Sequence, residues 1–222
     1  MITQVYAVRT LADIQLCIDA SLDRWGLEVG RNGTMPNERS YAQTRELFAA
    51  TPAPYPKMAL SIETDLDVLT ELVEATRPDL LHLCGDIRQL PPASVNALRD
   101  RIPGVEIIQA IPMTGPESLE IAHAYAEVAD ALLLDSVAPN VVGIGIAGVT
   151  HDWALSRQVV VEVGVPCILA GGLSPENVAE AIRAVRPWAV DSNTHTCIPG
   201  TWDKDFDRMR QFVLAARAAA EE

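Results

Sequence analysis

Residues 167–186 read CILAGGLSPENVAEAIRAVR and contain a strand, a tight turn and a helix within twenty residues. Cys167–Ala170 is a short apolar run, which is typical of a strand covered on both faces in a parallel sheet. Gly171 and Gly172 then let the backbone turn sharply, because neither residue has a Cβ. We expect Ser174 to cap a helix whose first turn begins at Pro175. The stretch therefore predicts one complete strand-turn-helix unit.

The helix of this unit is amphipathic, and a second strand follows it. Its apolar residues have the i, i+3, i+4, i+7 spacing of one buried face: Val178, Ala181, Ile182 and Val185. Trp188–Asp191 is the next apolar run, so the helix leads directly into another strand. Free backbone N–H groups at a turn before a helix suit an anion. Gly171 and Gly172 are therefore a candidate phosphate site.

The same alternation of strand and helix recurs along the whole chain. Eight units in 222 residues average about 28 residues each, which fits a compact (β/α)8 barrel. A doubly wound open sheet is the competing architecture, but the Gly-x-Gly-x-x-Gly turn that often accompanies it is absent. We predict a single-domain (β/α)8 TIM barrel over residues 1–222. The expected strands are Val5–Val8, Leu27–Gly30, Met58–Ile62, Leu80–Cys84, Val105–Ile111, Ala131–Asp135, Cys167–Ala170 and Trp188–Asp191.

Composition narrows the possible partners of the chain. The formal net charge of −13 argues against binding to nucleic acid or to an anionic membrane, since either partner attracts a basic surface. No apolar stretch is long enough to span a bilayer, and the N-terminus lacks the features of a signal peptide. The four cysteines form no Cys-x-x-Cys pair. We expect a cytoplasmic protein with a small anionic or sugar-like substrate, either a monomer or a homodimer.

Several motifs at the strand ends carry a resemblance to one family. Beside the unit at 167–186 and Val190-Asp191, the chain contains Leu132-Leu-Leu-Asp135, Gly148-x-x-His-Asp152-Trp153 and Leu81-His-Leu-Cys-Gly85-Asp86. In wording and order these motifs resemble the phosphoribosylanthranilate isomerase family. That family catalyses an Amadori aldose-to-ketose rearrangement in tryptophan biosynthesis. The resemblance implies a TIM barrel and an isomerase whose site lies at the carboxyl ends of the strands.

The resemblance implies an acid and a base. The family's general acid, an aspartate at the end of strand six, corresponds to Asp135. Its general base is a cysteine within Lys-Ile-Cys-Gly, where this chain reads Gln4-Val-Tyr-Ala7. Tyr6 therefore replaces the thiol and is a candidate to position substrate, since a phenol is a poor base near neutral pH. Glu28 and Glu63, both at strand ends, are candidate substitute bases.

Other residues are expected to bind substrate. Arg39 or Arg31 is a candidate for the substrate carboxylate, which a guanidinium grips through two bonds. His151 stands where the family has an aromatic residue and is a candidate pocket residue. The family's Asp-Val-Ser-Ser-Gly-Val-Glu is replaced here by DSNTHTC at 191–197, so side chains would replace the lost glycine. The candidate phosphate ligands are Gly171, Gly172, Ser192 and Thr194, and Asp191, Asn193 and His195 complete the pocket.

A metal site is a further possibility. His82 and Cys84 project to one side of a strand, and His195 and Cys197 repeat the spacing, which together gives four soft ligands. Because strands four and eight lie on opposite sides of a barrel, we expect no metal and no other cofactor, with His82 and Cys84 lining the substrate pocket. A metal-assisted lyase, epimerase or hydrolase, and a non-catalytic sugar-phosphate-binding protein, stay open as alternatives.

Overall fold

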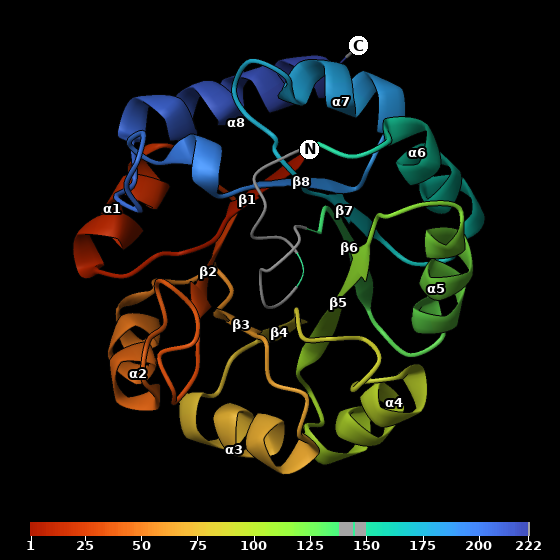
Figure 1. The fold of residues 1–222 in the computed structure, drawn as a ribbon. Helices are drawn as coiled ribbons and strands as arrows, with labels where there is room; N and C mark the ends of the chain where they lie inside the picture. The colour runs from red at the N-terminus through yellow and green to blue at the C-terminus, as the bar shows by residue number, and fades with distance from the viewer. Residues whose placement is uncertain (138–143, 145–149, 222) are drawn as a thin grey trace.

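The computed structural model describes residues 1–137, 144 and 150–221, and these form a closed barrel of eight parallel strands. Each strand pairs with the next in the sequence, and β8 closes the barrel against β1 (Figure 1). The predicted single-domain (β/α)8 barrel is therefore confirmed. The strands are β1 Ile2–Val5, β2 Arg24–Glu28, β3 Met58–Ser61, β4 Leu80–Leu83, β5 Glu106–Pro112, β6 Ala131–Asp135, β7 Cys167–Leu169 and β8 Ala189–Ser192.

Helices form a ring outside the strands, one after each strand (Figure 1). None of the helices in the described ranges is long and apolar enough to cross a membrane. Most of the glycine-rich segment between β6 and the next helix, including Gly148, lies outside the described residues. The helices are α1 Leu11–Asp19, α2 Tyr41–Ala50, α3 Leu66–Thr76, α4 Pro92–Arg101, α5 Glu117–Ala126, α6 Trp153–Glu162, α7 Val178–Val185 and α8 Phe206–Ala220, with a short 3-10 helix, η1, at Thr194–Thr196.

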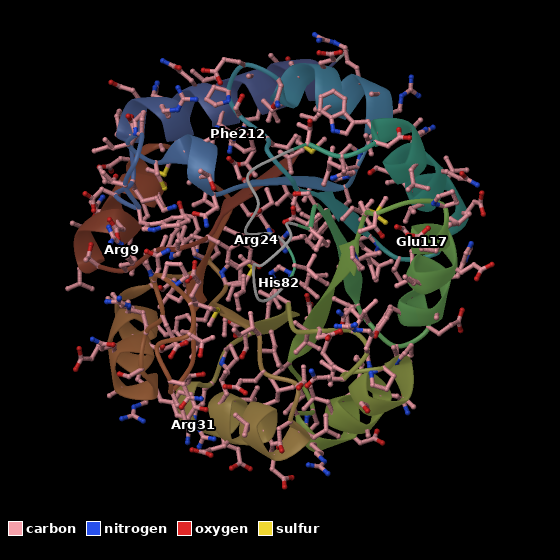
Figure 2. The ribbon with its side chains drawn as sticks, viewed as in Figure 1. Arg9, Arg24, Arg31, His82, Glu117 and Phe212 are labelled. Atoms are coloured by element: carbon pink, nitrogen blue, oxygen red, sulfur yellow. The ribbon has the colours of Figure 1, made fainter. Side chains whose placement is uncertain are left out.

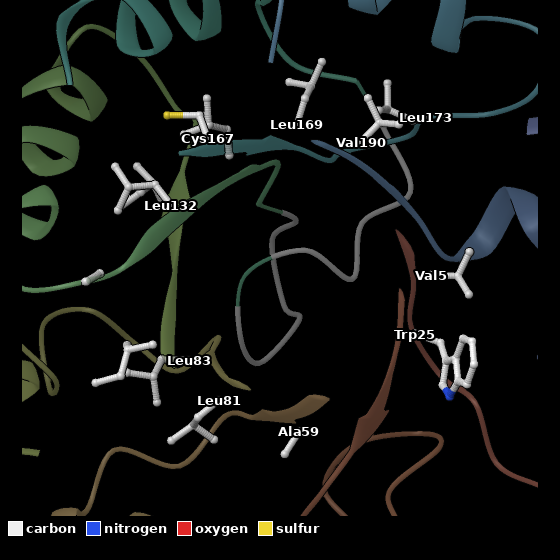
Figure 3. Packing of buried hydrophobic residues seen from close by; sticks show 14 of the residues in the cluster. Val5, Trp25, Ala59, Leu81, Leu83, Leu132, Cys167, Leu169, Leu173 and Val190 are labelled. Carbon is white, nitrogen blue, oxygen red and sulfur yellow. The ribbon is translucent and has the colours of Figure 1, made fainter. Parts of the chain in front are cut away.

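Successive apolar residues along the strands belong to two different cores. Val5, Leu132 and Val190 belong to the large cluster between the strands and the helices (Figure 3). Tyr6 and Leu133, one residue further along their chain segments, fill the barrel interior. This follows from the two-residue period of a strand, whose successive side chains point to opposite faces. Polar residues on the inner positions therefore face the interior or the mouth of the barrel.

The first two strands begin earlier than predicted. β1 covers Ile2–Val5 rather than Val5–Val8, because Ala7 adopts a left-handed conformation with φ of 59° and ends the extended chain. β2 covers Arg24–Glu28 rather than Leu27–Gly30. Its first residue is a buried arginine whose guanidinium carbon lies 4.8 Å from the ring centroid of Trp188. The prediction relied on apolar runs, and a charged residue at the start of β2 does not belong to such a run, so the predicted strand began too late.

The turn at Gly171 and Gly172 has the expected left-handed geometry, with φ values of 81° and 61°. α7 is assigned from Val178, with Asn177 before it, three residues later than the predicted start. The expected capping bond of Ser174 is present, because its hydroxyl accepts a hydrogen bond from the Glu176 N–H at 3.2 Å and its carbonyl accepts one from the Val178 N–H at 3.0 Å. The Asn177 side chain accepts a hydrogen bond from the Ser174 N–H at 2.8 Å and donates one to the Gly172 carbonyl at 3.0 Å. These two bonds hold the Asn177 side chain against the turn that Ser174 caps.

Candidate active site

Two small cavities lie at the carboxyl ends of the strands and share three residues, Asp135, Asp191 and Asn193. The turn cavity, of about 20 Å³, borders the Gly171 turn and the segment after β8. The deep cavity, of about 30 Å³, extends into the barrel interior. The turn cavity is lined by Asp135, Gly171, Gly172, Leu173, Asp191, Ser192, Asn193, Thr194 and His195, and the deep cavity by Tyr6, Glu28, Met35, Leu60, Ile62, His82, Cys84, Asp135, Ile144, Asp191 and Asn193.

Asp135 ends β6 on an inner position and is 6% exposed. Its Oδ1 accepts hydrogen bonds from the N–H of Ser136 at 2.7 Å and from the Ser136 hydroxyl at 3.3 Å. Burial, and next the charge of Asp191, raise the pKa of Asp135 to about 8, although the Ser136 bonds oppose this rise. At neutral pH the carboxyl is therefore protonated and is available as a proton donor.

Asp191 lies on β8 and is buried beside β1. Its Oδ1 accepts a hydrogen bond from Gln4 Nε2 at 3.1 Å. Burial raises the pKa of Asp191 to about 7, while the Gln4 bond and the charges of Lys204 and Arg24 lower it. The site therefore holds two carboxyl groups that titrate in neighbouring pH ranges.

These raised pKa values predict how stability depends on pH. Below about pH 4 both carboxyls are protonated in the folded and unfolded states, and the pKa shift has no effect. As pH rises toward 8, the unfolded chain gains by ionising while Asp135 resists ionisation, so the free energy of unfolding falls. Replacing Asp135 with asparagine removes this loss. We expect the stability of Asp135→Asn relative to wild type to rise between about pH 4 and 8 and then level off, by a few kcal/mol in all.

Denaturant titrations at a series of pH values measure this difference. Asp207→Asn, at an exposed position in the first turn of α8, is the matched control and should show a difference that is nearly constant with pH. A constant difference for Asp135→Asn as well would contradict the raised pKa of Asp135.

Tyr6 occupies the deep cavity, and its hydroxyl donates to Met58 Sδ at 3.2 Å. Gly26 makes room for it, because a Cβ there would lie 2.2 Å from a carbon of the Tyr6 ring. Burial, and next the charge of Asp191, raise the pKa of the Tyr6 phenol well above its ordinary value. The side chain is thus a neutral part of the barrel interior.

Removing the Tyr6 hydroxyl should therefore have little effect on catalysis. Tyr6→Phe keeps the ring over Gly26 and loses the hydroxyl with its bond to Met58, so we expect kcat within about threefold of wild type and stability lower by about 1 kcal/mol. Steady-state kinetics and thermal unfolding test both expectations. A hundredfold fall in kcat in a folded Tyr6→Phe protein would instead assign the hydroxyl a direct role.

His82 and Cys84 are brought together as predicted. Cys84 Sγ lies 3.2 Å from His82 Nε2, and His82 lies near the barrel centre (Figure 2). Burial lowers the pKa of His82 to about 3. Burial, and next the charges of Asp135, Asp191 and Glu28, raise the pKa of Cys84 well above its ordinary value. Both side chains are therefore neutral lining of the deep cavity.

His195 and Cys197, the second pair in the four-ligand metal hypothesis, do not lie beside His82 and Cys84 in the deep cavity. Cys197 lines neither of the two cavities, and its Sγ accepts a hydrogen bond from Lys204 Nζ at 3.4 Å. Within residues 1–137, 144 and 150–221, no group of three or more histidine, cysteine, aspartate or glutamate side chains is arranged to hold a metal ion. His82, Cys84, His195 and Cys197 therefore do not converge on one centre.

The loop after β2 positions Glu28 and Arg39. Both oxygens of Glu28 accept hydrogen bonds from Asn37, one from its N–H at 3.0 Å and one from its side-chain amide at 3.2 Å. Burial raises the pKa of Glu28 and the Asn37 bonds oppose the rise. Arg39 donates from Nε to the Asn37 carbonyl at 3.1 Å and lines neither cavity, while Arg31 pairs with Glu71 at the periphery (Figure 2).

The expected phosphate ligands border the turn cavity but differ in their bonding. The Ser192 hydroxyl donates to the Leu173 carbonyl at 2.7 Å, so it joins the two loops instead of offering a free donor. Asn193 Oδ1 accepts from Lys204 Nζ at 3.1 Å. Gly171 comes closest to the acid, because a Cβ there would lie 2.8 Å from His151 Nδ1 and 3.2 Å from Asp135 Oδ1. Only a residue without a side chain fits between these two groups.

His151 flanks the other side of Gly171. Its Nε2 lies 2.7 Å from the Ser156 hydroxyl, while its buried Nδ1 has no hydrogen-bond partner among the described residues. Burial lowers the pKa of His151 to about 4, so the ring is neutral at physiological pH. His151, predicted as a pocket residue, is therefore adjacent to the glycine turn but lines neither the turn cavity nor the deep cavity; it borders a separate cavity beside Met113 and Thr114.

Comparison with known proteins decides the family. The family model described as N-(5'phosphoribosyl)anthranilate (PRA) isomerase matches residues 4–215 of the chain. The chain belongs to the PRA isomerase family. The N-(5'-phosphoribosyl)anthranilate isomerase of Natronomonas pharaonis is 36% identical over 214 residues, which are 96% of each chain. That of Myxococcus xanthus is 34% identical over 222 residues, covering 97% of this chain and 95% of the relative.

Solved structures agree with the fold of this PRA isomerase family member. Phosphoribosyl anthranilate isomerase from Thermotoga maritima superposes with a TM-score of 0.82 at 23% identity and covers 98% of this chain and 100% of its own. The Thermus thermophilus structure gives a TM-score of 0.78 at 24% identity and covers both chains completely. At these identities the superpositions show the fold, so residue roles depend on the geometry of the site.

Three polar residues that bind site residues of this PRA isomerase family member escaped the sequence-based prediction, as did the apolar lining residues Met35, Leu60, Ile62, Ile144 and Leu173. Gln4 binds Asp191, Lys204 binds Asn193, and Asn37 binds Glu28. Gln4 carried one usable signal, since it is a polar residue two positions before Tyr6 and therefore shares its face. Lys204 and Asn37 come from long loops whose path no periodicity describes.

Proposed function

We propose that this chain isomerises N-(5'-phosphoribosyl)anthranilate, or a closely related amine glycoside of ribose 5-phosphate, to the corresponding 1-amino-1-deoxyketose. One observation carries the proposal. Asp135, protonated at neutral pH, lies in the same cavity as the Gly171 turn, so a proton donor stands next to a backbone suited to an anion. The isomerase names of the family's members support this assignment.

In this proposal Asp135 is the acid. It donates its proton to the ring oxygen of the sugar as the C1–O bond breaks, and the nitrogen lone pair forms the C1=N bond of an open-chain iminium ion. A buried carboxyl with a pKa of about 8 matches this task, because proton transfer is most effective when the pKa lies near the working pH. The other roles follow from position.

The phosphate of the substrate is assigned to the turn cavity. Gly171 and Gly172 have no side chains there, and Thr194 and His195 border it from the segment after β8. A solved family member is described in complex with reduced 1-(o-carboxyphenylamino)-1-deoxyribulose 5-phosphate, a compound that combines a phosphate, a chain of hydroxyls and a carboxylate. Arg39, on the loop after β2, is our candidate for the carboxylate, which requires its side chain to leave the Asn37 carbonyl. The cytoplasm is the expected place of action.

Turnover of N-(5'-phosphoribosyl)anthranilate by the purified protein tests the proposal. The product has the same mass as the substrate, so it is identified by reduction with borodeuteride, which places deuterium at C2 of the ketose. Growth of a tryptophan auxotroph lacking its own PRA isomerase gives an independent readout. A folded protein that neither converts the substrate nor restores growth would refute the proposal.

A second candidate is a sugar-phosphate-binding protein without catalysis. It is favoured by one observation, that Tyr6 replaces the thiol which the family resemblance implies and bonds to Met58. It predicts that the ketose product raises the melting temperature while the substrate is bound unchanged.

A further inference from the structure

The proposed reaction needs a base as well as an acid. After Asp135 has opened the ring, the proton on C2 must leave so that the C1=C2 double bond can form. Proton removal of this kind is effective when the base is ionised near neutral pH and faces the cavity of the acid. The base must therefore be sought among the titratable groups that line the two cavities.

Four of the titratable side chains in the two cavities are poorly suited to remove the C2 proton. The Tyr6 phenol is a hydrogen-bond donor to Met58 with a raised pKa. Cys84 is held as a neutral thiol by burial and by three nearby carboxyl groups. His82, with a pKa of about 3, holds a proton too weakly. Both oxygens of Glu28 already accept bonds from Asn37.

Asp191 differs from all of these in position. It lines both the turn cavity and the deep cavity, as Asp135 does, and its charge raises the pKa of Asp135. Its strand, β8, pairs with β1, where Gln4 lies opposite Asp191 and Val5 lies opposite Ser192. Gln4 Nε2 holds one carboxyl oxygen of Asp191 in place. The carboxylate is thus fixed between the anion-binding turn and the end of β1.

We propose that Asp191 is the base that removes the C2 proton, taking over the task that the family resemblance gives to a thiol at the position of Tyr6. This inference rests on the proposed function. The fixed position of Asp191 beside Asp135 supplies an acid and a base from two strands of one cavity. Burial raises the pKa of both carboxyls, and the charge of Asp191 raises that of Asp135 further, which favours a proton on Asp135 and a charge on Asp191.

The proton balance of the reaction closes with these two groups. Asp135 gives its proton to the ring oxygen as the C1–O bond breaks, and Asp191 then takes the C2 proton. The electrons of the C2–H bond form the C1=C2 bond, and those of the C1=N bond return to nitrogen. The resulting enol becomes the ketone when C1 takes the proton from Asp191 and the enol hydroxyl proton returns to Asp135. Both carboxyls end in their starting states.

Charged groups from several elements face Asp191 and set its titration. Lys204, before α8, and Arg24, on β2, lower its pKa, and Gln4 does so through its hydrogen bond. Asp135 on β6, Tyr6 after β1 and Cys84 after β4 each experience its charge, and His195 borders the same cavity. We therefore expect kcat to rise with pH through about 7, as Asp191 ionises, and to fall through about 8, as Asp135 loses its proton.

The experiment compares wild type and Asp191→Asn on N-(5'-phosphoribosyl)anthranilate carrying hydrogen or deuterium at C2. In Asp191→Asn we expect kcat to fall about 100-fold with KM changed less than about threefold. The rise of kcat with pH near 7, called the pH 7 limb of the pH–rate profile, should vanish, and the residual rate should show a primary isotope effect. Cys84→Ser and Glu28→Gln keep both limbs of the profile. Gln4→Met removes the bond to Asp191 and moves the limb to higher pH, which tests the proposal even if Asp191→Asn is unstable.

The possible failures are distinguishable. If wild type converts the substrate and folded Asp191→Asn retains the limb near pH 7, or if Cys84→Ser loses that limb, Asp191 is not the base and the proposed function stands. If Gln4→Met leaves the limb unmoved, the assignment of the limb to Asp191 also fails. If wild type converts nothing at any pH, the proposed function and this inference fall together.

Discussion

Asp135→Asn lowers kcat by about 1,000-fold at pH 7.5, the largest catalytic loss we expect from any single substitution in this chain. Asparagine keeps the shape of the side chain but has no proton to transfer to the ring oxygen. The loss should appear mainly in kcat, since the interaction with the ring oxygen forms as the C1–O bond breaks. The limb near pH 8 that belongs to Asp135 should disappear from the residual activity.

Steady-state kinetics across pH 5.5 to 9 provide the measurement. Glu117→Gln, an exposed carboxyl on the outer ring of the barrel (Figure 2), is the control and should retain wild-type kinetics. A denaturant titration of Asp135→Asn at pH 7.5 establishes that the variant is folded under the conditions of the assay. Activity within tenfold of wild type would remove Asp135 from the role of acid.

Gly171→Ala should abolish tight binding of the sugar phosphate. Its φ of 81° disfavours any residue with a Cβ, which costs about 1 to 2 kcal/mol of stability. The added Cβ would also lie 2.8 Å from His151 Nδ1 and 3.2 Å from Asp135 Oδ1, so the turn must shift away from the acid. We expect the affinity for the ketose phosphate product to fall by more than about 100-fold, because backbone N–H groups bind an anion only at close approach.

Gly104→Ala provides a matched comparison for this prediction. Gly104 also has a positive φ, of 87°, but a Cβ there meets no atom within 4 Å, and the residue lies between α4 and β5, away from the site. The backbone strain is thus similar in the two variants, and only the contacts differ. Calorimetric titration with the product should show weak binding for Gly171→Ala and unchanged binding for Gly104→Ala. Equal affinities in both variants would mean that the turn does not hold the phosphate.

The sequence predicted the arrangement of strands more accurately than their limits. Apolar runs such as Ala131–Asp135 coincide with the observed strand, because a strand buried on both faces needs a continuous apolar segment. β2 begins at Arg24, where a stacked tryptophan makes burial of an arginine possible. β1 ends before Tyr6–Val8, although those residues are apolar and buried, because the left-handed conformation of Ala7 interrupts the extended chain. Local composition therefore shows burial but not pairing.

The positions of residues along the strands predicted which of them line the candidate site. They did not predict the hydrogen bonds or the protonation of those side chains. Placing Asp135, Gly171 and Asp191 at strand ends was enough to bring them to one cavity, because parallel strands in a barrel share one edge. The Ser192 hydroxyl, expected to face a phosphate, is instead bonded to Leu173. Nothing in the sequence indicated that the rotamer of Ser192 would be set by a carbonyl on another loop.

The amino-acid sequence alone determined the eight-unit barrel and the glycine turn, since both depend on short-range periodicity. It also placed the carboxyl groups at the strand ends on one end of the barrel, because the carboxyl ends of parallel strands in a barrel face the same side. The tertiary structure decided which groups are charged. The pKa values of Asp135 and Asp191 depend on solvent exclusion, on the hydrogen bond from Gln4 of β1, and on charges brought by β2, β8 and the segment before α8. Asp135 and Asp191 come close to these groups and lose contact with water only when the barrel closes, so no local pattern in the chain predicts their pKa values.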